Sequence, residues 1–490
     1  MTTEGDQQKA AAAAESKKEK KKPEGLVIPP KKPKLSKAER RALQEQQRAA
    51  KAAAKQQPEP PKGAADPQNE PGKQNATKND AGSAGKDDAA RDAVQDKSDQ
   101  KTVSLFSHLP PYRDPKSVVE TGPHLWPKGV SLPSTTFPLH PAVIELGYQY
   151  AKGEIRGGNA RCRAMLAAFH QVIGDFEPPT NNGGLTDMRH QIDQWILKPS
   201  FQYWTASCRP HSVTMGNAFT FLKTAVASLE RDMTRDDMVE MIQETIDAYI
   251  RERIDLAKQA IAQQPALQLS TTSTTTTNNN NPQVFLTYGK SEAIAAIFRN
   301  MAASDQHSSS SFRVIIVDSR PLLEGKDLLL ELRASGIECS YVLLNALTYV
   351  MRDVTKVYLG ASALMSDGGV LGRVGTACVA LSAHMHHIPV LVCCESYKIS
   401  NRVQLESITG NELGDPSQVA MTTNASSSDD DDNNNNNGAL KDWLETDNLR
   451  LLNLLYDLTP SEFVSGIVTE LGIIPPTSVA VLLREMNPQN

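Results

Sequence analysis

The run RVIIVDSRP, residues 313–321, decides the fold of this chain, because four β-branched residues in succession end in a polar turn. Short uninterrupted apolar runs of this kind are typical of parallel strands buried on both faces. Four similar runs each end in a polar or glycine-containing turn: VFLTYG (284–289), CSYVLL (339–344), KVYLGAS (356–362) and PVLVCCE (389–395). Helical segments alternate with them, which predicts a Rossmann-like parallel-sheet domain over residues 283–490, with ligands at the carboxyl ends of the strands.

Residues 105–264 have the pattern of a helical domain, because apolar residues recur near helical spacing. Helices are predicted over residues 186–206, 212–230 and 235–262. Two low-complexity runs, residues 270–282 and 421–438, are predicted surface insertions, since the entropy of a loop grows only logarithmically with its length. The predicted fold class is therefore α/β, with a helical domain followed by a parallel-sheet domain.

Residues 1–100 are predicted to form a disordered basic arm and linker. The first sixty residues carry fifteen Lys and Arg against eight Asp and Glu, and few large apolar side chains offset the chain entropy lost on folding. Residues 39–55 consist almost wholly of good helix formers, behind the capping-box spacing of Ser36 and Glu39. Binding to RNA, ribosomes or an acidic protein surface is one interpretation of this basic helix, and a dispensable solvated helix is the other.

The 490-residue chain has a formal net charge of −5 and no apolar run near the roughly 20 residues that a membrane helix needs. Its first residues lack the hydrophobic core of a secretory signal. The six cysteines form no CxxC pair, so reduced thiols in the cytoplasm are expected. His384, His386 and His387 fall at the end of a predicted helix, residues 374–387, and neither a metal nor a cofactor is predicted.

The amino-acid sequences of these turns are more specific than the alternation of strands and helices. The motifs are VDSRP (317–321), GASALMSDGGVLGRVGT (360–376), CCESYK (393–398) and NEL (411–413). In this order they resemble the regulatory subunits of eukaryotic translation initiation factor 2B, and their sequences are most similar to the delta branch of that family. The resemblance continues upstream through LFSHLPPY (105–112) and downstream to TELGIIPP (469–476), and covers most of the chain beyond the first hundred residues.

The resemblance implies a fold shared with sugar-phosphate isomerases, in which a cysteine after the first strand and an aspartate in a GAD motif transfer a proton. Here the first strand ends in Tyr288, Gly289 and Lys290, and Ser362 stands in the aspartate position. Neither glycine nor an unassisted serine acts as a general acid or base near neutral pH. We interpret the chain as an inactivated isomerase scaffold and not an enzyme. The alternatives are an active sugar-phosphate isomerase and a sensor that binds a sugar phosphate or nucleotide without turnover.

A vestigial sugar-phosphate pocket is predicted from six residues: Arg156, Gly157, Gly158, Gly289, Ser362 and Arg373. Arg156, Gly157 and Gly158 are similar to the turn with which the isomerases hold a substrate phosphate. A cation beside glycine amides that precede a helix can form an anion site. A glycine pair between two helices serves equally as a structural turn, which is the favoured interpretation with the catalytic pair replaced.

The resemblance implies a regulatory subunit of the guanine-nucleotide exchange factor for translation initiation factor 2. Expected partners are the alpha, beta, gamma and epsilon subunits of the exchange factor, in a hetero-decamer, with no membrane and no specific nucleic acid. The alpha subunit of initiation factor 2 is the expected target, and its phosphorylation is sensed in the integrated stress response. Arg161, Arg163 and Arg209 are candidate contacts, because a guanidinium binds a carboxylate or phosphate through two bonds. Internal ion pairs are the alternative interpretation.

The segment LRLLNLLYDLTP, residues 449–460, has more leucines than one face of a short element requires. Candidates for a subunit interface are Leu449, Leu451, Leu452, Leu454 and Leu455. Alternatively, the segment supplies the last strand and helix of the same sheet, and both interpretations can hold. A capping-box spacing follows from Thr459 to Glu462, with Pro460 in the first helical position, which predicts a helix over residues 460–471.

Overall fold

The computed structural model describes residues 101–115, 118, 139–177, 187–231, 233–264, 283–304, 312–420, 440 and 442–486. All of these belong to one compact unit of the chain, Ala81–Asn490. The predictions of a basic arm over residues 1–100, of its helix over residues 39–55, and of insertions at 270–282 and 421–438 concern residues outside the described ranges. None of the described helices is long and apolar enough to cross a membrane.

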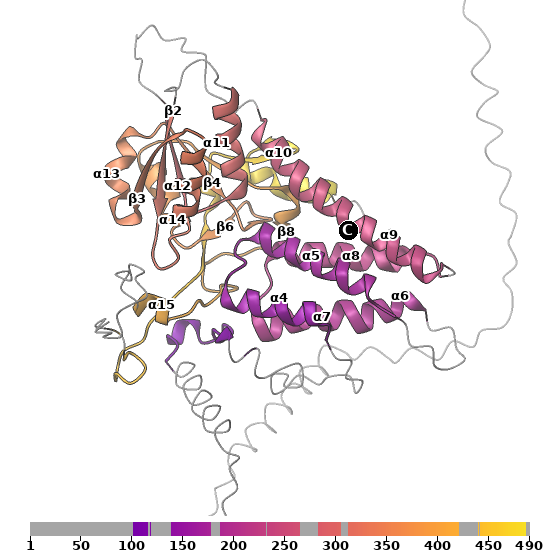
Figure 1. The fold of residues 1–490 in the computed structure, drawn as a ribbon. Helices are drawn as coiled ribbons and strands as arrows, with labels where there is room; N and C mark the ends of the chain where they lie inside the picture. The colour runs from indigo at the N-terminus through magenta and orange to yellow at the C-terminus, as the bar shows by residue number, and fades with distance from the viewer. Residues whose placement is uncertain are drawn as a thin grey trace, which may run out of the picture. The chain divides into compact units, whose positions relative to one another are not determined.

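The part of the chain before the sheet is helical (Figure 1). Its helices are α4 (Pro141–Lys152), α5 (Gly158–Gly174), α6 (Met188–Gln191), α7 (Lys198–Gln202), α8 (Val213–Ser228), α9 (Arg235–Tyr249) and α10 (Ala257–Ala262), with a short 3-10 turn η1 (Ser104–Phe106) and π-helical turns η2 (Ile192–Leu197), η3 (Tyr203–Cys208) and η4 (Ile250–Leu256). The π-helical turns continue the neighbouring helices, so residues 188–208 and 235–262 form two long helices. The helices predicted over residues 186–206, 212–230 and 235–262 are confirmed.

Side-chain caps fix where two of these helices begin. The Ser212 hydroxyl accepts a hydrogen bond from the Met215 amide at 3.4 Å, and the Thr234 hydroxyl accepts one from the Asp237 amide at 3.2 Å. Each cap satisfies one of the amides that have no partner inside the helix. The helices then pack around Trp204, which is fully buried and donates its indole N–H to the Val143 carbonyl at 2.8 Å.

A seven-stranded sheet follows, with the order β11-β10-β7-β4-β1-β2-β3. Its strands are β1 (Gln283–Tyr288), β2 (Phe312–Asp318), β3 (Glu338–Leu343), β4 (Lys356–Gly360), β7 (Val390–Cys393), β10 (Gly466–Thr469) and β11 (Gly472–Ile474). All neighbouring strands pair in parallel except β11, which pairs antiparallel with β10. The parallel-sheet prediction for residues 283–490 is thereby confirmed as a fold class.

Helices cover both faces of this sheet. They are α11 (Glu292–Ser304), α12 (Gly325–Ala334), α13 (Leu347–Val350), α14 (Thr376–Met385) and α16 (Val479–Met486). Alternate residues of β1 separate the two cores, because Phe285 packs with α10, α11 and α12, whereas Leu286 packs with α13, α14 and α16. The remaining short elements are η6 (Leu344–Ala346), η7 (Met351–Asp353), η8 (Ser396–Lys398), η9 (Ser461–Phe463), η10 (Pro476–Ser478) and α15 (Ser417–Ala420).

A second sheet of four strands has the order β8-β5-β6-β9. The strands are β5 (Ala363–Met365), β6 (Val370–Arg373), β8 (Ile399–Ser400) and β9 (Tyr456–Thr459). Strand β9 pairs antiparallel with β6, so the leucine-rich segment delivers its last residues into this sheet.

The helix predicted over residues 460–471 is wrong. Only the short 3-10 turn η9 forms at the capping-box residues, and the chain then enters β10 and turns at Gly472 into β11. Ile467 and Val468 are fully buried and extend the larger sheet beside β7. β-branched residues are suited to a strand that is covered on both faces, and this tertiary pairing outweighs the local helix signal.

Candidate functional site

A cavity of about 560 Å³ lies between the start of α5 and the carboxyl ends of the strands of the larger sheet. Five of the six predicted pocket residues line it: Arg156, Gly157, Gly158, Ser362 and Arg373. The sixth, Gly289, does not line this cavity. It lines a smaller neighbouring cavity together with Asp318 and Ser319. Local motifs more than 200 residues apart therefore meet in one place. That the cavity holds a sugar phosphate stays a prediction.

The start of α5 presents backbone amides to this cavity. Gly157 precedes the helix with φ of 86°, a conformation that favours glycine, and no side chain caps the helix there. Gly157, Gly158, Asn159 and Ala160 all line the cavity. The Arg156 side chain is exposed beside them and donates its Nε–H to the Gly153 carbonyl at 2.6 Å. The arrangement is at once a turn between α4 and α5 and a positive helix end that faces the cavity.

A buried lysine forms a second positive group. Lys398 is 6% exposed, and its Nζ lies 2.6 Å from Oε2 of Glu395. Asn159 donates to the other Glu395 oxygen at 2.7 Å and accepts from the Tyr397 hydroxyl at 2.6 Å. Burial disfavours both charges, but the mutual attraction of the pair outweighs it, so that the pKa of Lys398 is raised and the pKa of Glu395 is lowered.

Lys398 is the last residue of the motif CCESYK, and Asn159 directly follows the predicted pocket residue Gly158, but neither is among the predicted site residues. The signal available was a lysine and a glutamate three residues apart in CCESYK. Their partner Asn159 is 236 residues away from Glu395 in the chain, so no local pattern reveals the cluster.

Arg373 is held by a carboxylate of its own chain. Its Nε and a terminal nitrogen donate to the two Glu324 oxygens at 2.9 and 2.7 Å, and its guanidinium lies 5.3 Å from the centre of the Tyr456 ring. Burial disfavours the charge, but Tyr456 and Glu324 outweigh it and raise the pKa of Arg373. Because Glu324 already neutralises this cation, Arg373 contributes less to binding an anion than the sequence analysis implies.

The groups that would transfer a proton between carbon atoms are missing from the described lining. It includes no cysteine, and Ser362 stands on the strand-end turn where the isomerases place an aspartate. The acidic residues of the lining include Glu324, which Arg373 occupies, and Asp327 and Glu292, whose carboxylates lie 3.7 Å from Lys290 and 3.8 Å from Lys258. The lining also includes Glu154, whose carboxylate lies 2.5 Å from Lys152. The cavity can attract an anion, and the cysteine and aspartate expected of an isomerase are replaced in its described lining.

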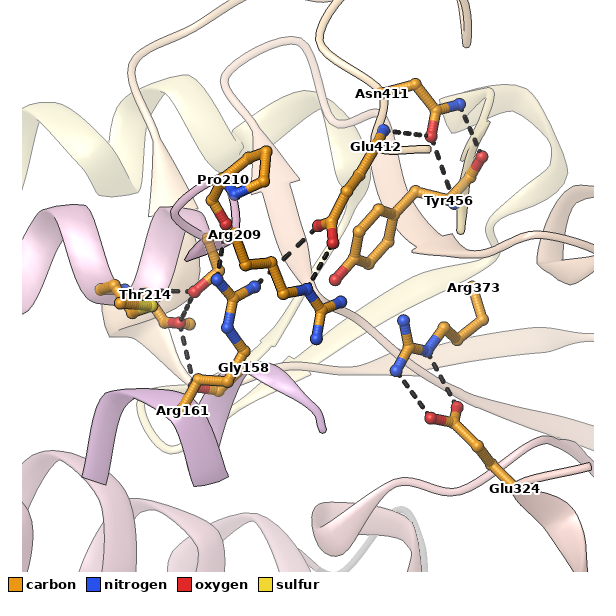
Figure 2. A network of polar contacts seen from close by, with 12 residues as sticks. Gly158, Arg161, Arg209, Pro210, Thr214, Glu324, Arg373, Asn411, Glu412 and Tyr456 are labelled. Atoms are coloured by element: carbon orange, nitrogen blue, oxygen red, sulfur yellow. Dashed lines mark hydrogen bonds and ion pairs between the residues drawn. The ribbon is translucent and has the colours of Figure 1, made fainter. Parts of the chain in front are cut away.

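Arg161 and Arg209 are largely covered by their own chain and both face Glu412 (Figure 2). Arg161 is 1% exposed, donates to the Pro210 carbonyl at 2.5 Å and lies 4.0 Å from a Glu412 oxygen. Arg209 donates to the other oxygen of Glu412. The structure thus places both residues in internal ion pairs, the alternative interpretation, and a contact of either with another protein stays a prediction. A guanidinium buried at this depth needs a carboxylate close by, which Glu412 provides for both.

Arg163 is the candidate that reaches the surface. Its side chain is 37% exposed and makes two hydrogen bonds to Asp255, of 3.0 and 2.8 Å. The hydrogen bonds to the Asp255 carboxylate raise the pKa of Arg163, although partial burial acts in the opposite direction. Asp255 occupies one edge of the Arg163 guanidinium. A role for Arg163 in contacting another protein stays a prediction.

The candidate interface leucines pack against their own chain. Leu455 is 9% exposed, and Leu449, Leu451, Leu452 and Leu454 are partly buried. Leu451 and Leu452 face Tyr112 and Trp443 across a small cavity. Partial burial leaves open whether these leucines also form a subunit interface, which stays a prediction. The segment ends in β9 of the smaller sheet, and β10, β11 and α16 follow it, so it supplies neither the last strand nor the last helix of the larger sheet.

The sequence pattern of the Initiation factor 2 subunit family matches residues 154–476, which include the helical part and the α/β part with its cavity. The chain belongs to this family. Within it, the chain is 35% identical over 387 residues to translation initiation factor eIF2B subunit delta of Schizosaccharomyces pombe, covering 79% of this chain and 74% of that protein. The delta subunit of Dictyostelium discoideum is 35% identical over 389 residues, and the chain spans 56% of its length.

Two further similarities are to a chain of a solved structure and to an isomerase. The tetrameric eIF2B-beta2-delta2 complex from C. thermophilum contains a chain that matches with a TM-score of 0.57 and 26% identity, covering 76% of this chain and 99% of that one. Ribose 1,5-bisphosphate isomerase of Pyrococcus furiosus is 30% identical over 204 residues, covering 41% of this chain and 56% of the isomerase. The recognition made from the motifs is confirmed.

Proposed function

We propose that this chain is a delta-type regulatory, non-catalytic subunit of the exchange factor that acts on translation initiation factor 2. The proposal is supported by 35% identity to eIF2B delta subunits over 79% of the chain. The similar solved structure is a tetramer of beta and delta subunits, so a beta-type subunit is the first partner expected. Alpha, gamma and epsilon subunits complete the proposed assembly in the cytoplasm.

The observation that carries the non-catalytic part is the composition of the 560 Å³ cavity. The positive start of α5 is retained, while Ser362 occupies the carboxylate position and the described lining contains no thiol. A scaffold that keeps its fold and loses its proton-transfer groups is suited to protein contacts rather than turnover.

We also propose that the complex binds the alpha subunit of initiation factor 2 and senses its phosphorylation. Arg163 is the remaining candidate contact from the sequence analysis, because its guanidinium is partly exposed and held rigidly by Asp255. A phosphoserine brings up to two negative charges, which an oriented guanidinium recognises through paired hydrogen bonds.

Coexpression with a beta-type subunit tests the assembly. The two chains should copurify and elute together in size exclusion, and the full complex should catalyse nucleotide exchange that phosphorylated substrate inhibits. Arg163→Gln should relieve the inhibition and leave basal exchange intact, while Arg251→Gln, an exposed arginine of η4, serves as the matched control. Failure of the chain to associate with any partner subunit would contradict the proposal.

A non-catalytic sensor of sugar phosphates is the second candidate, and the amides of α5 with Arg156 beside one cavity favour it. Ribose 1,5-bisphosphate should then bind to the full chain in saturable fashion and without turnover. Arg156→Gln should weaken the binding, because this exposed guanidinium has no carboxylate partner among the described residues. Isomerase turnover by the natural chain would show that the proton-transfer groups were misidentified.

A further inference from the structure

We infer that a second large cavity of this chain binds a small aromatic anion. The cavity has a volume of about 390 Å³ and is separate from the one described above, since Ser362 is the only described residue that lines both. It lies between the start of α8 and the end of β8, where the helical part meets the smaller sheet. Sites for small molecules typically have volumes of roughly 300–1,000 Å³.

One wall of this cavity is aromatic. The rings of Phe201 and Phe219 stack with centroids 4.0 Å apart and planes 11° apart, and the His211 ring lies 5.6 Å from Phe201. All three residues line the cavity, and none of them is fully buried. Phe219 stacks on Phe201 and also on Phe169, at 6.2 Å, so a planar ring that enters the cavity packs against Phe201 and His211.

The same cavity carries a guanidinium that has no partner among the described residues. Arg402 lines the cavity and is exposed, and among the described residues its guanidinium makes no hydrogen bond or ion pair. Its backbone is fixed on both sides, because its amide donates to the Ser400 hydroxyl and its carbonyl accepts from the Ser366 hydroxyl, each at 3.2 Å. The side chain is thus anchored at the cavity with its donors available.

The charged and titratable residues of the lining leave this cation unopposed. They are His211, Arg402, Glu412 and Tyr456. Glu412 is the acidic member, and its oxygens face Arg161 and Arg209. Burial, followed by the charges of Arg402 and Arg161, lowers the pKa of His211, so the imidazole is neutral near pH 7 and adds a ring rather than a charge. The first turn of α8 also contains no acidic side chain.

Aromatic rings and a guanidinium that line one cavity select for two features in one ligand. The ligand needs a planar ring for Phe201 and His211, and a carboxylate or a similar anion for Arg402, because a charged hydrogen bond of this kind is short and directional. A cationic ring system is disfavoured by Arg402 and by the arginines behind Glu412. The inference uses no subunit contact and is independent of the proposed assembly.

Titration of the purified full chain with indole-3-acetate, followed by ligand-observed NMR, tests the site. We expect saturable binding, at least tenfold weaker binding of tryptamine, which has the same ring and an ammonium group, and none of acetate. Arg402→Gln should weaken indole-3-acetate binding about tenfold, as expected for loss of a charged hydrogen bond. Arg156→Gln, which changes an exposed arginine of the first cavity, is the matched control and should leave the affinity unchanged.

Three results would overturn the inference: no saturable binding of indole-3-acetate, equal affinity for tryptamine, or equal weakening by Arg402→Gln and Arg156→Gln. Phe219 contacts the helical core, so Phe219→Leu tests the aromatic wall only where its thermal midpoint matches that of the natural chain. Arg402 is exposed and its guanidinium has no partner among the described residues, so its replacement keeps the experiment decisive if the Phe219 variant unfolds.

Discussion

Glu412 faces two buried guanidinium groups, so its loss leaves two cations in the interior without a counter-charge. Arg161 and Arg209 are 1% and 10% exposed at the side chain and face its two oxygens. Glu412→Gln keeps the shape but leaves both cations without a counter-charge. Removing one partner of a buried ion pair costs about 3–5 kcal/mol, and urea denaturation of the isolated chain should show a loss of this size.

Glu406→Gln is the control for this prediction, because Glu406 lies in the same loop and is exposed. Its stability should match that of the natural chain to within about 0.5 kcal/mol. An unchanged free energy of unfolding in Glu412→Gln would mean that solvent already screens the two arginines.

Asp457 makes the stability depend on pH. Its Oδ2 accepts from the amides of Gly375 and Ala377 at 2.7 and 3.1 Å, while its Oδ1 is buried without a hydrogen-bond partner among the described residues. Burial raises the pKa of Asp457 to about 6, although the two amides act in the opposite direction. The folded state therefore binds the proton more tightly than the unfolded state, and this stabilisation is lost as the pH rises from about 4 to about 7.

Asp457→Asn keeps an oxygen for the two amides and removes the titration. The difference in unfolding free energy between the natural chain and this variant should change by about 2 kcal/mol between pH 4.5 and pH 7, with the natural chain relatively less stable at pH 7. Denaturant titrations at the two pH values measure it. Asp447→Asn, at an exposed aspartate of the preceding segment, should show no such change.

For helices and strands, the sequence predicts those elements whose residues alone carry the pattern of the element. Runs such as VIIV are continuously apolar because a buried parallel strand has no face toward solvent. Strands β1, β2, β3, β4 and β7 all form where such runs lie. Strand β10 was missed because its capping signal is local while its pairing with β7 is not. Most of the pocket residues could be predicted because each lies in a short turn motif that is readable from neighbouring residues alone. The clusters around Glu395 and Glu412 were missed because their partners lie about 200 residues away or more.

The leucine-rich segment before β9 gives the prediction at this scale. Leu455 is 9% exposed, and its backbone bonds both Glu412 and Val374. Leu455→Asp therefore buries a charge within the chain itself and should lower the free energy of unfolding of the isolated chain by several kcal/mol. Leu405→Asp, at a leucine that is 87% exposed, should change it by less than about 0.5 kcal/mol.

Thermal unfolding of the two single variants without any partner measures this difference. The result separates the two interpretations of the leucines. If Leu455→Asp keeps the stability of the isolated chain and only prevents copurification with a beta-type subunit, the leucine belongs to the subunit interface that the sequence analysis predicts.

For the whole molecule, the described helical and α/β parts share cores and ion pairs. Ile261 of α10 packs into the core of the larger sheet, and Tyr397, which follows β7, packs into the helical core. Polar contacts cross between the parts at Asn159 with Glu395 and at Asn217, which donates to the carbonyls of Tyr397 and Ile399 at 2.8 and 3.0 Å. The boundary predicted between residues 264 and 283 therefore separates two patterns of sequence whose cores are interleaved in the fold.

Interleaved cores predict that the two parts unfold together. If either part opened alone, it would expose apolar side chains of the other and separate the buried Glu412 from Arg161 and Arg209, which costs several kcal/mol. Differential scanning calorimetry of the chain should show one transition whose calorimetric and van 't Hoff enthalpies agree. The double variant Asn159→Ala and Asn217→Ala should lower the midpoint and keep a single transition, because the shared cores remain. Two separate transitions in the natural chain would show that the helical part is an independent domain, as the sequence pattern suggests, and that the contacts across the boundary are too weak to couple it to the sheet.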